Sequence, residues 1–133
     1  MTEQYPRELS EHESATIRMA IGTMSVGREE ALAQLATAKH GGPAHAGTHP
    51  CFFIDLPNEV TAIPVGSEYP LTLWVAPDKH TVGSIELFVE NGRLHSLDWS
   101  EVSLTDDAPA VSDFPSLDRI SAQKWPDDFD LRA

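Results

Sequence analysis

Three histidines and the only cysteine of the chain lie within twelve residues, in the stretch HGGPAHAGTHPC. Neutral imidazole and thiolate are ligands of zinc, and three such ligands plus a water would resemble a catalytic site. Zinc sites favour C-x2-C or H-x3–5-H pairs set in defined turns, however, whereas these side chains share one Gly/Pro-rich stretch. The pattern therefore favours a flexible helix-to-strand connection with solvent-exposed imidazoles, and no cofactor is expected. The weak metal-ligand candidates are His40, His45, His49 and Cys51.

The same stretch offers one nucleophile, Cys51, with a base two residues away. His49 would point to the same side of a strand as Cys51 and could take its proton. A thiol at the start of an apolar strand is more often a small buried side chain. A metal- or thiol-dependent hydrolase is therefore kept as an alternative, no catalytic residue is assigned, and a non-enzymatic protein is expected.

Acidic and aromatic residues near the C-terminus form the second candidate site. The Asp pairs do not fit the D-x-[DN]-x-[DN]-G loop that binds calcium. In the segment WPDDF the carboxylates flank two aromatic side chains, and this composition suits docking onto a basic protein, with Trp as the anchor. The predicted partner-binding residues are Asp106, Asp107, Asp113, Trp125, Asp127, Asp128, Phe129 and Asp130.

The charge balance is the strongest global signal. The chain has 21 Asp and Glu against 9 Lys and Arg, for a formal net charge of −12. Such a field repels nucleic acids and anionic membranes and steers a cationic partner toward the surface. High charge also confers solubility without any partner. We expect a protein-binding module of inhibitor or immunity type that masks a basic site on a toxin or a nucleic-acid-binding protein, with nucleic-acid mimicry as a further alternative.

Length and composition predict one domain. The 133 residues are divided here into a domain over 1–120 and an acidic, mobile tail over 121–133. One cysteine excludes an intramolecular disulfide. The N-terminus lacks a basic region followed by an apolar run, and no stretch of 18 apolar residues occurs, so the expected location is the cytoplasm.

Two helices are predicted in the first 40 residues. Ser10 and Glu13 form a capping box that starts the first helix, which ends near Met24. Its apolar stripe is Ile17, Ala20, Ile21 and Met24. The second helix is expected from Gly27 to Lys39, with His40 also in its last turn and Gly41-Gly42-Pro43 as the stop. Its expected buried stripe is Leu32, Leu35 and Ala36.

Strand patterns follow from Pro50 onward. Strands are predicted at 51–56, around 71–75 and 85–89, and at 93–102. Asn91-Gly92 predicts a type I′ hairpin turn, because both positions require positive φ. The fold class is therefore α+β, with two N-terminal helices packed on an antiparallel sheet of three to five strands, followed by an irregular C-terminal segment.

The predicted hairpin register makes both faces of the sheet partly apolar. A two-residue turn sets Val89 opposite Leu94 and Phe88 opposite His95. One face then carries Ile85, Leu87, Val89 and Leu94, and the other carries Phe88, Leu97 and Trp99. We expect the helices to cover one face and the C-terminal segment, with a short helix over 116–124, to cover the other. An apolar second face would also suit a homodimer.

The segments REEALAQLATAKHGG, THPCFFIDL and SIELFVENGRLHSLDW resemble a family of small uncharacterised bacterial proteins, mostly actinobacterial. That family has a GREALRAQL-like helix, a Cys-rich link into a strand and an LHVxDGRLxxLEW-like hairpin. The resemblance covers roughly residues 27–102 and implies the helix and the hairpin. Where the family has several cysteines, this chain has only Cys51, which argues against a metal or redox role. In general type, the chain is similar to the acidic immunity proteins of bacterial toxin systems.

Overall fold

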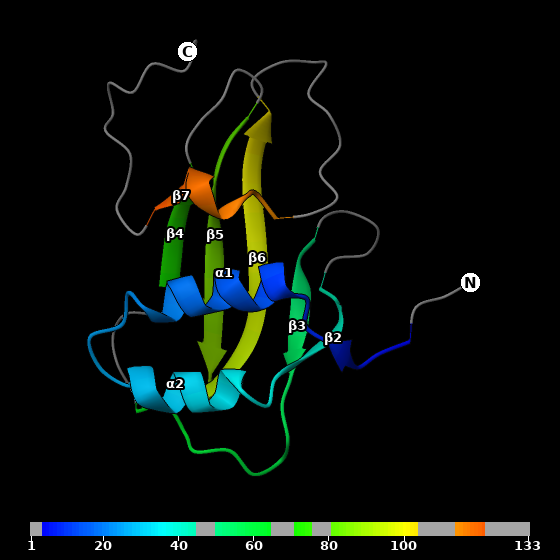
Figure 1. Ribbon diagram of the computed structural model, residues 1–133, viewed down its shortest axis with the longest axis vertical. Helices are drawn as coiled ribbons and strands as arrows, with labels where there is room; N and C mark the ends of the chain where they lie inside the picture. Colours follow the sequence, from blue (N-terminus) through cyan, green and yellow to red (C-terminus); the bar gives the residue numbers. More distant parts are fainter. Residues whose placement is uncertain (1–3, 45–49, 65–70, 76–80, 104–113, 122–133) are drawn as a thin grey trace.

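Two helices and a seven-stranded antiparallel sheet form two layers in the computed structural model, which confirms the α+β class (Figure 1). The structure describes residues 4–44, 50–64, 71–75, 81–103 and 114–121. The elements are β1 (Arg7–Glu8), α1 (Glu11–Ile21), α2 (Arg28–Leu35), β2 (Lys39–Pro43), β3 (Phe52–Asp55), β4 (Leu71–Val75), β5 (Thr81–Glu90), β6 (Arg93–Ser103), the 3-10 helix η1 (Leu117–Arg119) and β7 (Ile120–Ser121).

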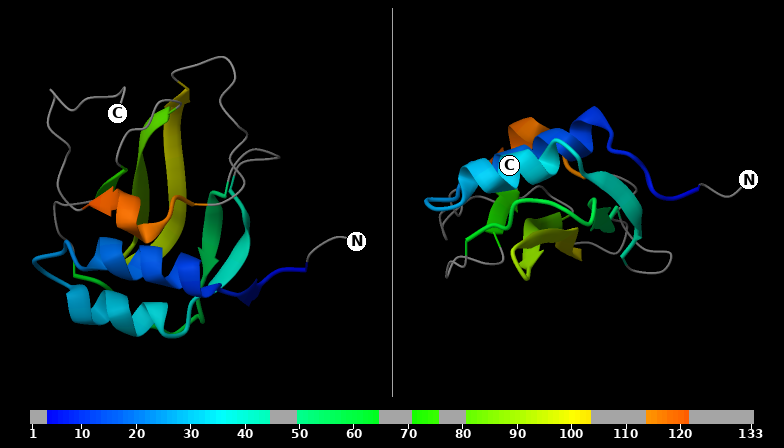
Figure 2. Two further views of the ribbon diagram at one scale, coloured as in Figure 1. Left: turned by 45° about the horizontal axis from the view of Figure 1, so that its top comes forward. Right: turned by 90° about the horizontal axis from the view of Figure 1, so that it is seen from below.

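Both helices and η1 lie on the same face of the sheet, as the two views of Figure 2 show. We call this the inner face. No described helix or strand lies over the opposite, outer face. Strand alternation and register place the following residues on the outer face: Phe53, Asp55, Thr72, Trp74, Ser84, Glu86, Phe88, Glu90, Ser96, Asp98 and Ser100.

The strand order is β1-β2-β3-β6-β5-β4-β7. Its central four strands follow a Greek-key order, because β6 returns to pair with β3. The four predicted strands are present as β3, β4, β5 and β6, but the expected total of three to five is too low. The additional strands are β1 and β7, of two residues each, and the glycine-containing β2. None of the three has an alternating apolar pattern long enough to predict a strand.

Helix α1 begins as predicted. The N–H of Glu13 donates to Ser10 Oγ at 3.0 Å, and the N–H of Ser10 donates to Glu13 Oε1 at 2.9 Å, which completes the capping box. The helix ends at Ile21, three residues before the predicted end. The whole predicted stripe is nevertheless buried, and Met24 reaches the core from the turn that follows the helix.

Helix α2 is shorter than predicted, and its buried face is different. It ends at Leu35, and Lys39 and His40 belong to β2 instead of a last helical turn. Leu35 is buried, but Leu32 is 38% exposed and Ala36 is also exposed, so two of the three predicted stripe residues were assigned wrongly.

A polar residue, Gln34, which was not in the predicted stripe, is buried in α2 together with Ala31 and Leu35. Its side chain is 1% exposed, and its Nε2 donates to the carbonyls of Thr61 at 2.7 Å and Gly92 at 2.8 Å. Its Oε1 accepts from the N–H of Leu94 at 2.9 Å. These bonds join α2 to the 56–64 connection and to the hairpin turn. An amide with all these partners can be buried at little cost, which a hydrophobic pattern cannot reveal.

The hairpin turn is confirmed, whereas the register beyond it is not. Asn91 and Gly92 have φ of 53° and 74°, and Val89 pairs with Leu94 as predicted. Phe88 then pairs with Ser96 and not with His95, because one extra residue of β6 forms a β-bulge.

The bulge corrects the predicted distribution of apolar residues. Beyond it, Leu97 pairs with Leu87 and Trp99 pairs with Ile85 on the inner face, and all of these side chains are buried. Only Phe88 of the three predicted second-face residues lies on the outer face. An alternation counted from the turn is one residue out of step after a bulge, so Leu97 and Trp99 were assigned to the wrong side.

The described part of the C-terminal segment packs on the inner face and not over the outer one. The ring of Phe114 meets Phe52 edge-to-face at 6.1 Å, and the Pro115 carbonyl lies 2.9 Å from His12 Nε2 of α1. The predicted helix over 116–124 is wrong, because η1 leads directly into β7, which pairs with β4. Residues 104–113 and 122–133, including nearly all of the predicted tail, lie outside the described part.

Deletion of His95 is expected to preserve the fold, because the shortened β6 can pair Val89 with Leu94 and Phe88 with Ser96 in an unbroken ladder that keeps Leu97 and Trp99 on the inner face. Insertion of one alanine between Ser96 and Leu97 is expected to prevent cooperative folding, because it turns Leu97 and Trp99 outward, and loss of their burial is comparable to the net stability of a domain, on the order of 5–15 kcal/mol. The measurement is urea unfolding followed by near-ultraviolet circular dichroism. His95→Ala keeps the residue count and should stay within about 1 kcal/mol of the original protein. An insertion variant as stable as His95→Ala, or a deletion variant that does not unfold cooperatively, would contradict the assigned register.

Candidate functional site

His40, a predicted metal-ligand candidate, is a buried strand residue. It is 6% exposed and pairs with Ile54 across β2 and β3. Its imidazole is stacked between Tyr5 and Phe52, with ring centroids 5.0 Å and 4.2 Å away. The N–H of Gly42 donates to His40 Nδ1 at 3.1 Å. These contacts give His40 a structural role, and the expectation of a solvent-exposed imidazole was wrong at this position.

A partly buried ion pair lies beside His40 and joins the N-terminal segment to α1. The two terminal guanidinium nitrogens of Arg7, Nη1 and Nη2, donate to the Glu13 carboxylate at 3.1 Å and 3.0 Å. His40 Nε2 lies 4.0 Å from Glu13 Oε2. Burial raises the pKa of Glu13, but the hydrogen bonds from Arg7 and from the Ser10 N–H, together with the charge of Arg7, outweigh it. The net pKa of Glu13 is lowered.

The side chain of Cys51 forms hydrogen bonds with the backbone of β6 at Trp99. Its Sγ accepts from the N–H of Trp99 at 3.2 Å and donates to the Trp99 carbonyl at 3.6 Å. The side chain is 3% exposed, and burial raises the pKa of the thiol. A buried, protonated thiol lacks the properties of a catalytic nucleophile.

Of the four candidate metal ligands, the structure describes His40 and Cys51, and it does not bring these two together. His40 and Cys51 take part in separate contacts, and His45 and His49 lie outside the described residues. Among the residues that are described, no group of three or more His, Cys, Asp or Glu side chains could hold a metal ion. The hydrolase alternative therefore gains no support from His40 or from Cys51.

Aromatic side chains gather on the outer face instead. Phe53 is 43% exposed, and it lies in a row across three strands with Ser96 and Phe88, which is half-buried. His95, the bulge residue, meets Phe53 edge-to-face with ring centroids 5.5 Å apart. Trp74, also half-buried, lies further along the same face on β4.

A concave site of about 310 Å³ opens between these rings, and we call it the outer pocket. His95 forms part of its wall and is held there by two contacts. Its Nε2 lies 3.0 Å from Glu90 Oε2, and its Nδ1 lies 3.3 Å from Ser96 Oγ. The lining residues are Ala44, Phe53, Phe88, Val89, Glu90, His95, Ser96 and Asp98.

Carboxylates surround the aromatic residues. Glu90 and Asp98 line the outer pocket, and Glu86 lies opposite Asp98 across the strands. In the described part of the chain, two basic side chains lie at the margin of this face. The ammonium of Lys39 is 3.8 Å from Glu8. Arg93, which pairs with Glu90 across the hairpin, donates to the carbonyls of Leu56 and Pro57. In the described residues, the outer pocket is therefore lined by two acidic side chains and by no lysine or arginine.

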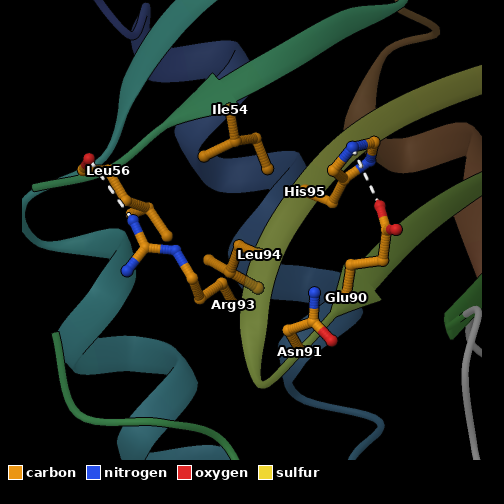
Figure 3. A pocket seen from close by; sticks show the side chains of 7 residues that line it. All are labelled: Ile54, Leu56, Glu90, Asn91, Arg93, Leu94 and His95. Carbon is orange, nitrogen blue, oxygen red and sulfur yellow. Dashed lines mark hydrogen bonds and ion pairs between the residues drawn. The ribbon is translucent and has the colours of Figure 1, made fainter. Parts of the chain in front are cut away.

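A second hollow of about 230 Å³ lies between β3 and the start of β6 (Figure 3). These strands pair only at two positions before the bulge separates them. Ile54, Leu56 and Leu94 line the hollow, and Arg93 spans it by donating to the carbonyls of Leu56 and Pro57. Figure 3 shows Arg93 directed toward Leu56, on the opposite side from the Glu90–His95 pair.

The outer pocket was not predicted from the sequence, and the predicted partner-binding residues cannot be compared with it. All eight of them, from Asp106 to Asp130, lie outside the described residues. The sequence did carry one signal for the pocket, because Phe88 was assigned to a second face of the hairpin. Phe53 was within a predicted strand, but its exposure depends on which side of β3 is covered.

In comparisons with known proteins, no family model, no curated protein and no solved structure matches this chain. The resemblance to the small actinobacterial proteins and the similarity in type to immunity proteins therefore stay predictions. No helix in the described ranges is long and apolar enough to cross a membrane. Function must be inferred from the geometry of the outer face.

Glu13→Gln is expected to destabilise the protein by about 2–4 kcal/mol at neutral pH, because it leaves the Arg7 charge partly buried without its carboxylate. The folded pKa of Glu13 lies below its unfolded value, so the stabilisation is present above the ordinary value of about 4.5 and is lost as pH falls below it. The free energy of unfolding of both proteins is measured with urea across this pH range. The difference between the two values should decrease as the pH falls.

Glu11→Gln is the matched control, because Glu11 is an exposed acid in the same first turn of α1. The free energy of unfolding of this variant should stay close to that of the original protein throughout the acid range. If the loss of unfolding free energy caused by Glu13→Gln does not change with pH, the assigned ion pair is contradicted.

The Cys51 thiol is expected to react with a disulfide reagent at least about 100-fold more slowly in the folded protein than in denaturant, because it is buried and bonded to Trp99. The rate is measured by absorbance after addition of the reagent. Ser100→Cys adds an exposed thiol on the outer face as an internal control, and that thiol should react at once. Equal rates for both thiols would overturn the structural role of Cys51.

Proposed function

We propose that the chain is an acidic protein-binding module that masks a basic site on a partner protein through its outer face. The supporting observation is the combination of two aromatic rings, the exposed Phe53 and the half-buried Phe88, with the carboxylates of Glu86, Glu90 and Asp98 on a face that no described element covers. Aromatic side chains commonly supply most of the binding energy of an interface, and surrounding charges select the partner.

Charge supports a protein with a cationic surface as the partner. The net charge of −12 acts at long range and increases the rate of encounter with a positive protein. The same field opposes binding of nucleic acid, whose phosphates are also negative. Nucleic-acid mimicry would require carboxylates spaced like phosphates, and the aromatic rings between them favour ordinary protein docking.

The rigidity of the surface supports an inhibitor or immunity type of module. Phe53, Ser96 and Phe88 lie on the paired strands β3, β6 and β5, so little ordering is required of them on binding. A preorganised surface binds more tightly for the same contact area, since less conformational entropy is lost. Tight and fast binding is what masking of a toxin would require.

Capture from an extract of the source cells tests the proposal. The immobilised protein should retain one basic protein at near-equal stoichiometry at low salt, as measured by mass spectrometry. The double variant Phe53→Ser, Phe88→Ser should retain at least about tenfold less, since removal of aromatic anchors commonly costs 2 kcal/mol or more. Retention should also fall in high salt, because salt screens the charges.

Leu32→Ser is the matched control. Leu32 is exposed to nearly the same fraction as Phe53, but it lies on α2, on the other side of the sheet. This variant should retain the partner fully. No basic protein on the original chain, or equal amounts on the double variant, would contradict the proposal.

A further inference from the structure

We propose that the outer pocket is a subsite for one arginine side chain, presented by the basic partner. This inference rests on the proposed function and specifies the chemistry of its anchor. The pocket combines aromatic and acidic side chains within about 310 Å³. A single long cationic side chain matches all of these features.

The walls provide surfaces for a flat cation. Phe53 and Phe88 lie on either side of Ser96 in one cross-strand row, and Ala44 also lines the pocket. A guanidinium is planar and weakly hydrated, and it stacks on aromatic faces, whereas its methylene stem packs on apolar side chains. Such cation–π contacts attract the guanidinium to the face of the ring.

The carboxylates provide the acceptors. Glu90 and Asp98 line the pocket, and guanidinium carries five N–H donors that suit the two oxygens of a carboxylate. The ammonium of lysine is a compact, strongly hydrated charge that neither stacks nor bonds in this bidentate way. Arginine is therefore the favoured occupant.

The Glu90–His95 contact prepares the acceptor. Glu90 is 65% exposed, and such a side chain would ordinarily sample many rotamers. His95 Nε2 lies 3.0 Å from Glu90 Oε2, and this contact holds the carboxylate beside the pocket. A carboxylate has about four acceptor positions, so Glu90 can bind His95 and a guanidinium together. At the bulge, His95 and Ser96 both lie on the outer face, and the His95 imidazole contacts Glu90 there.

The test is a titration of the 15N-labelled full chain, followed by NMR, with the peptide acetyl-Gly-Arg-Gly-amide. The matched probe replaces arginine by citrulline, which has nearly the same shape but no charge. The arginine peptide should shift the amides of Phe53, Phe88 and Ser96 and bind at least about tenfold more tightly than the citrulline peptide. The corresponding lysine peptide should bind more weakly than the arginine peptide. Equal binding of arginine and citrulline peptides, or of arginine and lysine peptides, would overturn the assignment.

Variants locate the binding. Phe88→Ala and Glu90→Gln should each weaken binding of the arginine peptide by about threefold or more, because each removes one kind of contact. Leu32→Ala and Glu11→Gln are the controls from the helical layer and should leave the affinity unchanged. An unchanged affinity in both pocket variants, or shifts confined to amides of the helices, would place the binding elsewhere and overturn the proposal.

The two proposals fail separately. Capture of a basic protein through Phe53 and Phe88, without binding of the arginine peptide at the outer pocket, would retain the proposed function and overturn the arginine subsite. Binding of the peptide at the pocket, without capture of any basic protein, would uphold the subsite and overturn the protein-binding function.

Discussion

The β-bulge at His95 is the constraint on which both faces of the sheet depend. Because one additional residue of β6 is accommodated as a bulge, Leu97 and Trp99 lie against Leu87 and Ile85 beneath the helices. The same residue brings an imidazole onto the outer face, next to Phe53 and Glu90. Bulges commonly redirect side chains in this way near functional sites. The core and the candidate binding surface therefore arise from a single local irregularity.

Buried polar side chains join the two layers. Gln34 links α2 to the hairpin turn, Cys51 bonds to the backbone of Trp99 on β6, and Glu13 joins Arg7 to the start of α1. Each of these groups has a defined partner, so its burial adds specificity without leaving an unsatisfied donor or acceptor. Apolar burial drives the layers together, and these bonds determine their relative placement.

Local signals in the sequence were reliable where one interaction dominated. The Ser10–Glu13 capping box and the Asn91-Gly92 turn were predicted correctly because each depends on a few adjacent residues. The face of Trp99 and the burial of Gln34 depend on partners far along the chain, so no periodicity could reveal them. The outer pocket was missed for the same reason, since Phe53 and Phe88 meet only through β6.

The strand order has a consequence for the sequence of events in folding. β5 and β6 are joined by a two-residue turn, and such a hairpin forms within microseconds. Phe52 of β3 pairs with Leu97, far along the chain, so this contact requires closure of a long loop. We expect the hairpin to form early and to serve as the template on which β3, and then β2 and β1, assemble. The outer pocket, which needs both β3 and the hairpin, would be among the last parts of the surface to become complete.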